Sequence, residues 1–275
     1  MKILVTGANG YLGQGIVKSL CDMGAEVLAA DFSVENVDTR AKAFPCDLFS
    51  IDYPHTYFGC PEVVLHLAWR DGFVHNSLRH VDDLPAHYAF LRKMAESGAR
   101  RLCVMGTMHE IGFFEGCINE NTPCQPQNLY GIAKDALRKL TKQLCLEKNI
   151  GFQWLRGYYI VGNSRFGNSI FSKITAAEQE GKTEFPFTTG QNQYDFVDYP
   201  DFCTQVAAAT MQDAVDGIIN ICSGRPEKLC DRVERFIKEN GYAIRLAYGK
   251  FPDRPYDSKA VWADDSKIQK ILKNK

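Results

Sequence analysis

A tyrosine and a lysine one helical turn apart are the side chains of this chain best suited to acid–base catalysis. They belong to the segment Tyr130-Gly131-Ile132-Ala133-Lys134. A free phenol has a pKa of about 10, and shifting it to neutrality requires roughly three pKa units, or about 4 kcal/mol of differential stabilisation. Lys134 lies on the same helical face, so we expect its positive charge to stabilise the phenolate of Tyr130. Such a pair can exchange a proton with a carbonyl or hydroxyl oxygen.

A glycine-rich turn near the start of the chain has the spacing of a dinucleotide clamp. The turn spans residues 6–13 and has the sequence TGANGYLG. Gly7 permits a tight bend, Gly10 lets the backbone approach a pyrophosphate, and Gly13 lets the following helix pack close to the strand. The helix N-terminus, which contains Tyr11 and Leu12, then faces the phosphates and stabilises their charge. Together with the downstream tyrosine and lysine, this turn predicts nicotinamide redox chemistry.

An acidic residue, Asp31, ends the second predicted strand. A carboxylate at this place can accept hydrogen bonds from the adenosine ribose hydroxyls. It would also repel the extra phosphate of NADP, by about 1 kcal/mol in water-like surroundings and roughly 4 kcal/mol at an effective dielectric near 20. The sequence therefore favours NAD. Arg40 and Lys42 leave NADP binding open, and an ordinary surface-turn aspartate is the alternative interpretation of Asp31.

The composition favours a globular protein that binds a small molecule. With 275 residues and 45% hydrophobic content, the chain can form one large domain or a domain with a small appendage. The 32 basic and 33 acidic residues give a net charge of -1 without a long basic run, which argues against nucleic-acid binding. The cysteines and histidines do not show the spacing of zinc sites, so we expect no metal and ten reduced thiols.

The beginning of the chain predicts a cytoplasmic location. The first predicted strand starts at Lys2 and runs directly into the glycine turn, which leaves no room for a signal peptide. The sequence also lacks an apolar run of about 20 residues, the length needed to span a bilayer. We therefore expect no membrane partner.

The order of apolar segments predicts a doubly wound α/β fold. Short apolar runs alternate with helical patterns, which is typical of a parallel sheet covered on both faces. Strands are predicted at 2–5, 25–30, 62–67, 101–105 and 152–156, with 217–222 returning to the sheet, and helices at 11–23, 130–148, 169–179 and 201–211. On the 130–148 helix, the residues predicted to lie on or near the buried side are Ile132, Leu137, Leu140, Leu144 and Leu146. We divide the chain into a dinucleotide-binding domain at 1–156 and a smaller α/β substrate-binding lobe at 157–275.

Two further motifs, with the glycine spacing, make the chain resemble the extended short-chain dehydrogenase/reductases, a family of sugar-nucleotide epimerases, dehydratases and reductases. The CDL sequence at 46–48 resembles the family's adenine-contacting step, and the HLAW sequence at 66–69 resembles a His-Leu-Ala-Ala segment that lies along the cofactor. Without the resemblance, His66 is interpreted as a satisfied core histidine. The resemblance implies a Rossmann fold over nearly the whole chain and adds four cofactor contacts: Asp47, Leu48, Leu67 and Ala68.

The resemblance also implies a third catalytic residue, a serine or threonine after the fifth strand that hydrogen-bonds the substrate oxygen. Thr107 occupies this place, counted back from Gly112, and a strand-end cap is the alternative. Family dehydratases usually have an Asp-Glu pair directly after this threonine, whereas Met108 and His109 follow here and Glu110 is one place out of register. A dehydratase is therefore disfavoured, which leaves a keto reductase or an epimerase.

Two positions of the substrate lobe depart from the family pattern. Tyr159 stands where an asparagine commonly holds the sugar-nucleotide diphosphate, and Tyr194 replaces a phosphate-binding arginine. A nucleotide sugar stays the favoured substrate, with a smaller or differently held carbonyl compound as the alternative. An aromatic cluster is expected either to shape the pocket or, more conservatively, to form core: Tyr158, Tyr159, Phe166, Phe171, Phe185, Phe187 and Tyr194.

These observations and the resemblance predict an NAD(P)-dependent oxidoreductase that reduces the keto group of a nucleoside-diphosphate 4-keto-6-deoxysugar. Tyr130 would exchange the proton, Thr107 would orient the oxygen, and Lys134 would tune the tyrosine. The alternative is an NAD-dependent sugar-nucleotide epimerase with no net redox change. A non-catalytic nicotinamide-sensing protein is disfavoured because the chain keeps both Tyr130 and Lys134. By resemblance, we expect a homodimer formed through the helix that bears the tyrosine.

Overall fold

A seven-stranded parallel sheet forms the centre of the molecule. The structure is a computed structural model that describes residues 1–162, 169–252 and 257–273. The strand order is β11-β7-β5-β4-β1-β2-β3. Successive strands are therefore added first on one side of β1 and then, from β4 on, on its other side, so the strand order reverses at the centre of the sheet. The strands are β1 (Lys2–Thr6), β2 (Glu26–Asp31), β3 (Lys42–Pro45), β4 (Val63–His66), β5 (Arg101–Thr107), β7 (Gly151–Gly157) and β11 (Gly217–Ile221). This order confirms the predicted doubly wound α/β fold.

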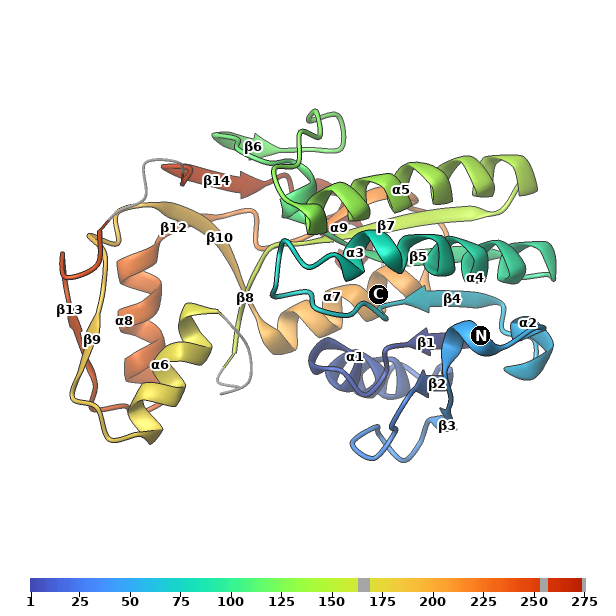
Figure 1. Ribbon diagram of the computed structural model, residues 1–275, viewed down its shortest axis with the longest axis horizontal. Helices are drawn as coiled ribbons and strands as arrows, with labels where there is room; N and C mark the ends of the chain where they lie inside the picture. The colour runs from blue at the N-terminus through green and yellow to red at the C-terminus, as the bar shows by residue number, and fades with distance from the viewer. Residues whose placement is uncertain (163–168, 253–256, 274–275) are drawn as a thin grey trace.

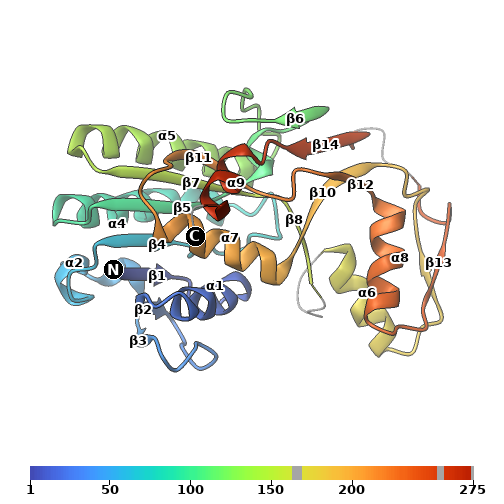
Figure 2. The same ribbon diagram turned by 180° about the vertical axis from the view of Figure 1, so that it is seen from behind.

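Helices cover both faces of this sheet because both faces of its strands are apolar. Ile3 and Val5 of β1 pack in one core cluster, whereas Leu4 points to the other. Figures 1 and 2 show the two helical layers. One layer contains α1 (Tyr11–Asp22), α7 (Tyr199–Met211) and α9 (Ser266–Lys273), and the other contains α2 (Pro54–Tyr57), α3 (Arg79–Asp82), α4 (Leu84–Glu96) and α5 (Leu129–Lys148). The carboxyl ends of β1, β4 and β5 therefore open at one edge, where parallel α/β sheets bind ligands.

A second, smaller sheet lies beyond this edge. Its order is β12-β10-β14-β6, β8 pairs with β10, and β9 pairs with β13 in a separate two-stranded sheet. Together with α6 and α8, these strands form the end of the molecule away from β1 (Figure 1). The bounds are β6 (Gly116–Ile118), β8 (Tyr159–Val161), α6 (Ile170–Gln179), β9 (Glu184–Pro186), β10 (Gln193–Asp198), β12 (Pro226–Lys228), α8 (Leu229–Glu239), β13 (Arg245–Ala247) and β14 (Ala260–Ala263).

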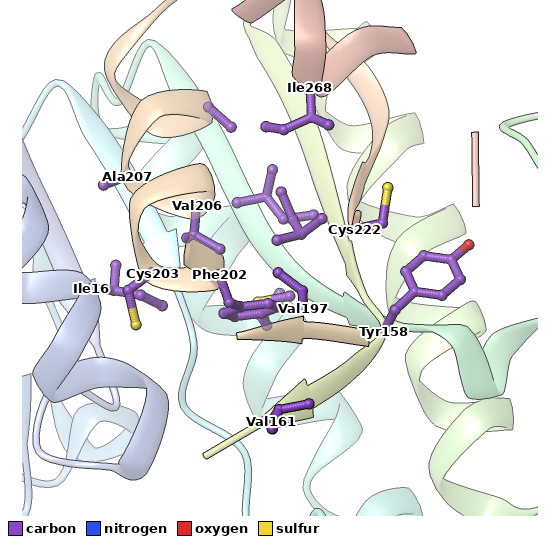
Figure 3. Packing of buried hydrophobic residues seen from close by; sticks show 14 of the residues in the cluster. Ile16, Tyr158, Val161, Val197, Phe202, Cys203, Val206, Ala207, Cys222 and Ile268 are labelled. Atoms are coloured by element: carbon purple, nitrogen blue, oxygen red, sulfur yellow. The ribbon is translucent and has the colours of Figure 1, made fainter. Parts of the chain in front are cut away.

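Helix α7 joins the two parts through the larger apolar core. Its Phe202 and Val206 are fully buried. Figure 3 shows Cys203 of this helix next to Ile16 of α1, and Phe202 next to Val197 at the end of β10. The predicted aromatic cluster is mostly core, since Tyr158, Phe171, Phe187 and Tyr194 are buried and Tyr159 and Phe185 are partly buried. Phe166, the remaining member, lies outside the described residues.

The predicted buried face of α5 is partly wrong. Leu137 and Leu144 are buried, but Ile132, Leu140 and Leu146 are exposed. The buried stripe instead follows the small and polar residues that let the helix approach the sheet closely: Gly131, Ala133, Lys134, Asp135, Thr141 and Cys145. A Cβ atom at position 131 would lie 2.3 Å from the His109 carbonyl oxygen, which shows how tight this approach is.

None of the helices in the described part of the chain combines the length and apolar character needed to cross a membrane.

Candidate active site

The glycine turn after β1 has no room for side chains at two of its glycines. Gly7 has a φ of +70°, and a Cβ atom there would lie 2.7 Å from the amide nitrogen of Ala68. A Cβ atom at Gly13 would lie 2.2 Å from the Gly7 carbonyl oxygen, so α1 starts in direct contact with the turn. Among the described residues, no side chain caps the N-terminus of α1 at Gly10. Its first amide groups can therefore bind an anion such as a pyrophosphate.

The predicted contacts to the adenosine half lie around this turn. Asp31 ends β2, and its Oδ2 accepts a hydrogen bond from the Asn9 amide at 3.0 Å, which places the carboxylate against the glycine turn. Asp47 caps a 3-10 turn by accepting a hydrogen bond from the Phe49 amide at 3.1 Å. Leu48 lines a small cavity of about 50 Å³ together with residues of α4. The backbone of Leu67 and Ala68 packs against Gly7, so these two residues border the glycine turn.

The predicted catalytic tyrosine lies in the first turn of α5. Asn128 caps this helix by accepting a hydrogen bond from the Gly131 amide at 2.8 Å. The Tyr130 amide donates to the His75 carbonyl oxygen at 2.9 Å, so the segment after β4 also fixes the tyrosine backbone. One turn further, the Lys134 ammonium donates to the Met105 carbonyl oxygen at 2.8 Å and lies 4.0 Å from the ring centre of Trp69.

Thr107 meets this pair at the carboxyl end of β5. The Thr107 side chain lies next to the Tyr130 phenol, whose pKa it lowers, and its Oγ1 accepts a hydrogen bond from the His109 amide at 3.3 Å. The Thr107 amide donates to the buried carboxylate of Glu110 at 2.7 Å. The structure thus brings together the three predicted residues, Thr107, Tyr130 and Lys134. Thr107 is also a strand-end cap, and its role toward the substrate oxygen stays a prediction.

Burial dominates the electrostatics of the site. Burial raises the pKa of Tyr130 to about 12, although the Thr107 hydrogen bond opposes this change. Burial likewise lowers the pKa of Lys134 to about 7, and the negative charge of Glu110 opposes that change. In the polypeptide alone, burial holds the pKa of the Tyr130 phenol above its usual value, and the expectation that Lys134 tunes this pKa toward neutrality stays a prediction. At neutral pH the phenol is a proton donor.

His66 lies in the core rather than along the cleft surface. It is buried between the Thr6 hydroxyl, 2.8 Å from its Nδ1, and the Nδ1 of His87, 2.8 Å from its Nε2. Burial lowers the pKa of His87 to about 3 and that of His66 well below its usual value. Both imidazoles are neutral at physiological pH, and they connect β1, β4 and α4 beneath the glycine turn.

In the second sheet, Asp195 ties β10 to its neighbours. Its carboxylate accepts hydrogen bonds from the amides of Ser223, Gly224 and Ala263 at 2.7, 3.0 and 3.1 Å. The adjacent Tyr194 packs against Tyr159 with ring centres 4.5 Å apart. The two tyrosines that depart from the expected phosphate contacts therefore lie side by side.

Comparison with known proteins decides the family. Residues 3–222 match the model of the NAD dependent epimerase/dehydratase family, which covers both the glycine turn and the tyrosine–lysine pair. This chain belongs to that family. The membership confirms the family predicted from the glycine spacing and the motifs at 46–48 and 66–69.

Within the family, a curated relative is the dTDP-6-deoxy-L-talose 4-dehydrogenase (NAD(+)) of Aggregatibacter actinomycetemcomitans. It is 42% identical over 268 residues, which cover 95% of this chain and 99% of the relative. The UDP-glucose 4-epimerase of Lactobacillus helveticus is 23% identical, with 99% of this chain and 91% of the relative covered. Among solved structures, the UDP-glucose 4-epimerase of Thermotoga maritima has a TM-score of 0.84 at 22% identity and covers 98% of this chain and 92% of its own. This last similarity shows the fold of the epimerases.

The family pattern did not predict the histidine-rich surroundings of the tyrosine. The Tyr130 ring lies 5.8 Å from His75, 5.2 Å from His80 and 5.8 Å from His109, measured between ring centres. Trp69, at the place of the family's second alanine, donates from its Nε1 to His80 Nδ1 at 3.0 Å. Five of the six histidines of the chain fall between residues 66 and 109. This clustering is the feature of the sequence that could have predicted a histidine-rich site.

Proposed function

We propose that this protein is an NAD-dependent oxidoreductase that interconverts a keto and a hydroxyl group at position 4 of a nucleoside-diphosphate 6-deoxysugar. The contact of Thr107 and Tyr130, with Lys134 one turn away, is the observation that carries this proposal. The 42% identical relative, named as a dTDP-6-deoxy-L-talose 4-dehydrogenase, supports this choice of substrate. Because Met108 and His109 stand where dehydratases have acids, reduction or oxidation without loss of water is favoured.

The cofactor fits the surface formed by the glycine turn. Gly7 and Gly13 leave no space for side chains, and the uncapped amides of α1 suit a pyrophosphate. Asp31, at the end of β2, would accept hydrogen bonds from the adenosine ribose, and Asp47, Leu48, Leu67 and Ala68 would make the further contacts to the cofactor. NAD supplies the hydride acceptor and NADH the hydride donor when bound. The Asp31 carboxylate favours NAD over NADP.

Proton transfer on the sugar oxygen is assigned to Tyr130. In the reductive direction its protonated phenol, with a pKa of about 12, donates to the oxygen as the carbonyl becomes a hydroxyl. The Thr107 hydroxyl orients the same oxygen, because the Thr107 side chain lies next to the phenol. In its protonated form, Lys134 stabilises the phenolate that remains. In the oxidative direction the phenolate takes the proton back.

We also propose the wider setting of the enzyme. Residues 1–156 would bind NAD, with β11 completing the sheet, and residues 157–275 would form the substrate lobe. The exposed apolar residues Ile132, Leu140 and Leu146 on α5 support a homodimer formed through this helix. All ten cysteines are free thiols, which is typical of a reducing compartment and supports a cytoplasmic location.

The test is the ultraviolet absorbance of NADH, and separately of NADPH, on mixing the protein with a panel of nucleoside-diphosphate 4-keto-6-deoxysugars. We expect stoichiometric loss of the NADH signal and a Thr107→Val variant about 100-fold slower in kcat. Thr141→Val is the matched control, since the Thr141 hydroxyl is buried on α5 without a hydrogen-bond partner among the described residues. Conversion of the sugar without NADH loss would indicate the epimerase alternative. Cofactor binding without conversion would indicate a sensor.

A further inference from the structure

Glu110 is a fully buried carboxylate directly behind the candidate active site. It follows Thr107 by three residues and forms a reciprocal cap with it, in which the Thr107 amide donates to Glu110 Oε1 at 2.7 Å. The indole Nε1 of Trp154 donates to the same carboxylate, at 2.8 Å from Oε1 and 2.9 Å from Oε2. With a further bond from Arg156 Nη2 at 3.4 Å, four bonds from three donors fix the Glu110 side chain, and through it the end of β5.

Two arginines complete the environment of this carboxylate. Arg156 of β7 is fully buried, with its Nη2 3.4 Å from Glu110 Oε2, and Arg138 of α5 has its Nε 3.7 Å from the same oxygen. Within the described chain, the Nε and Nη1 of Arg156 have no hydrogen-bond partner. The Glu110 carboxylate is thus the group that compensates the Arg156 charge inside the protein.

The backbone next to the Glu110 carboxylate has a glycine, Gly106, where a side chain would collide with that carboxylate. A Cβ atom at Gly106 would lie 2.1 Å from Trp154 Nε1 and 2.7 Å from Glu110 Oε1, so any side chain there would displace both groups. The glycine lies between Met105, whose carbonyl oxygen accepts the Lys134 ammonium, and Thr107. The backbone atoms that hold Lys134 and Thr107 are therefore consecutive, and the carboxylate lies directly against them.

We propose that Glu110 is a positioning residue for the reaction: its carboxylate holds the Thr107 amide, and with it the Thr107 hydroxyl, in line with Tyr130. This inference rests on the proposed function. It assigns a role to a carboxylate that is out of register with the acids of dehydratases. Instead of facing the substrate, Glu110 points inward and acts through its neighbours.

The charge of Glu110 has a measurable signature in the pH dependence. Its negative charge raises the pKa of both Lys134 and Tyr130. Removing the charge lowers both pKa values, so the activity in the reductive direction, which needs the phenol and the ammonium, is lost at lower pH. The other titratable or charged groups around these two residues and Glu110 are His66, His75, His80, His87, His109, Cys124, Arg138 and Arg156.

The test compares the pH profile of kcat for NADH-dependent reduction in Glu110→Gln with that of the unmodified protein. The glutamine keeps an oxygen for the Thr107 amide but has no charge, so we expect the alkaline limb to move down by about one pH unit. Glu110→Leu, which also removes the anchor, is expected to lower kcat by about 100-fold with little change in KM for NADH. Glu110→Leu leaves Arg156 without a carboxylate and can lose its fold, so circular dichroism is measured for each variant. The pH profile of Glu110→Gln is the deciding measurement.

Asp135→Asn is the matched control, because Asp135 is a buried carboxylate on α5 that pairs with Arg138 and Lys139 without touching Thr107. Its pH profile is expected to match that of the unmodified protein. An unshifted alkaline limb in Glu110→Gln, or the same shift in Asp135→Asn, would overturn the inference. If Thr107→Val keeps full activity, the proposed function itself is contradicted. If Thr107→Val is inactive but Glu110→Gln has the pH profile of the unmodified protein, only the role of Glu110 is rejected.

Discussion

The hydroxyl of Tyr199 donates a hydrogen bond to the carbonyl oxygen of Tyr11 at 2.5 Å. The same hydroxyl accepts a hydrogen bond from the Gly15 amide at 3.1 Å, and the two tyrosine rings lie 4.5 Å apart. Tyr11 and Gly15 are one turn apart on α1, so a phenol from α7 bridges the first turn of the helix that follows the glycine turn. A Cβ atom at Gly15 would lie 2.5 Å from this hydroxyl, which explains the glycine there.

Tyr199→Phe is expected to weaken NADH binding, because it removes the group that fixes the first turn of α1. Loss of the two hydrogen bonds should also lower the free energy of unfolding by about 1 to 2 kcal/mol. Calorimetric titration with NADH and denaturant unfolding measure the two effects. Tyr248→Phe is the control, because the Tyr248 hydroxyl donates a hydrogen bond to Glu234 on the protein surface, in the part of the chain assigned to the substrate lobe. Equal NADH affinity in both variants would contradict the role of Tyr199.

Gly13→Ala should destabilise the protein by several kcal/mol, since its Cβ atom would lie 2.2 Å from the Gly7 carbonyl oxygen and 2.6 Å from that of Ala8. These neighbours are backbone atoms and cannot move aside. Gly72→Ala, where no atom lies within 4 Å of the added Cβ, should change stability by less than about 0.5 kcal/mol. Thermal unfolding compares the two variants. A Gly13→Ala protein of normal stability would show that α1 can shift away from the turn.

His87 should make the protein less stable in acid. Burial lowers its pKa in the folded state to about 3, against 6.5 in the unfolded chain, so the unfolded state binds an extra proton as the pH falls between these values. Stability is lost at about 1.4 kcal/mol per pH unit in this window and is unaffected by His87 above it. Urea unfolding at a series of pH values should give a shallower slope for His87→Gln. An unchanged slope would mean that His87 is protonated in the folded protein.

Leu140→Glu should dissociate the proposed dimer, because it introduces a charge on the exposed apolar surface of α5. Light scattering after size exclusion measures the mass of each protein. The comparison variant is Lys142→Glu, a charge change on the same helix outside the apolar set. A monomeric unmodified protein, or a Leu140→Glu dimer, would reject α5 as the interface.

The parallel sheet was predicted from the sequence, and each strand and helix that was predicted begins and ends within two residues of its boundaries in the structure. This was possible because these strands are apolar on both faces and because α1 has a clear buried stripe of Ile16, Val17 and Leu20. Strand β3 was missed because it is a short edge strand with mostly exposed side chains. The exposed Ile132, Leu140 and Leu146 were placed wrongly because their apolar side chains lie on a surface outside the core.

At the candidate site, the spacing predicted that Tyr130 and Lys134 share a helical face, and the family resemblance added Thr107, which lies next to Tyr130. The electrostatics could not be predicted in the same way, because desolvation depends on tertiary burial. Trp69 over Lys134 is one example, since residues 69 and 134 become neighbours only in the fold. Glu110 is another: its partners Trp154 and Arg156 come from β7, and no local pattern connects them to Thr107.

The most direct test of the proposed reaction follows deuterium from NADH that carries deuterium at both hydrogen positions of the nicotinamide C4 to the sugar. With a dTDP-4-keto-6-deoxysugar, mass spectrometry should find one deuterium on the sugar C4 per NADH oxidised. Tyr130→Phe should lose this transfer while NADH affinity stays within about threefold, because only the proton donor is removed. A product that contains no deuterium, or a Tyr130→Phe variant that transfers it at the normal rate, would contradict the assignment of Tyr130 as the acid of a nicotinamide-dependent 4-keto reduction.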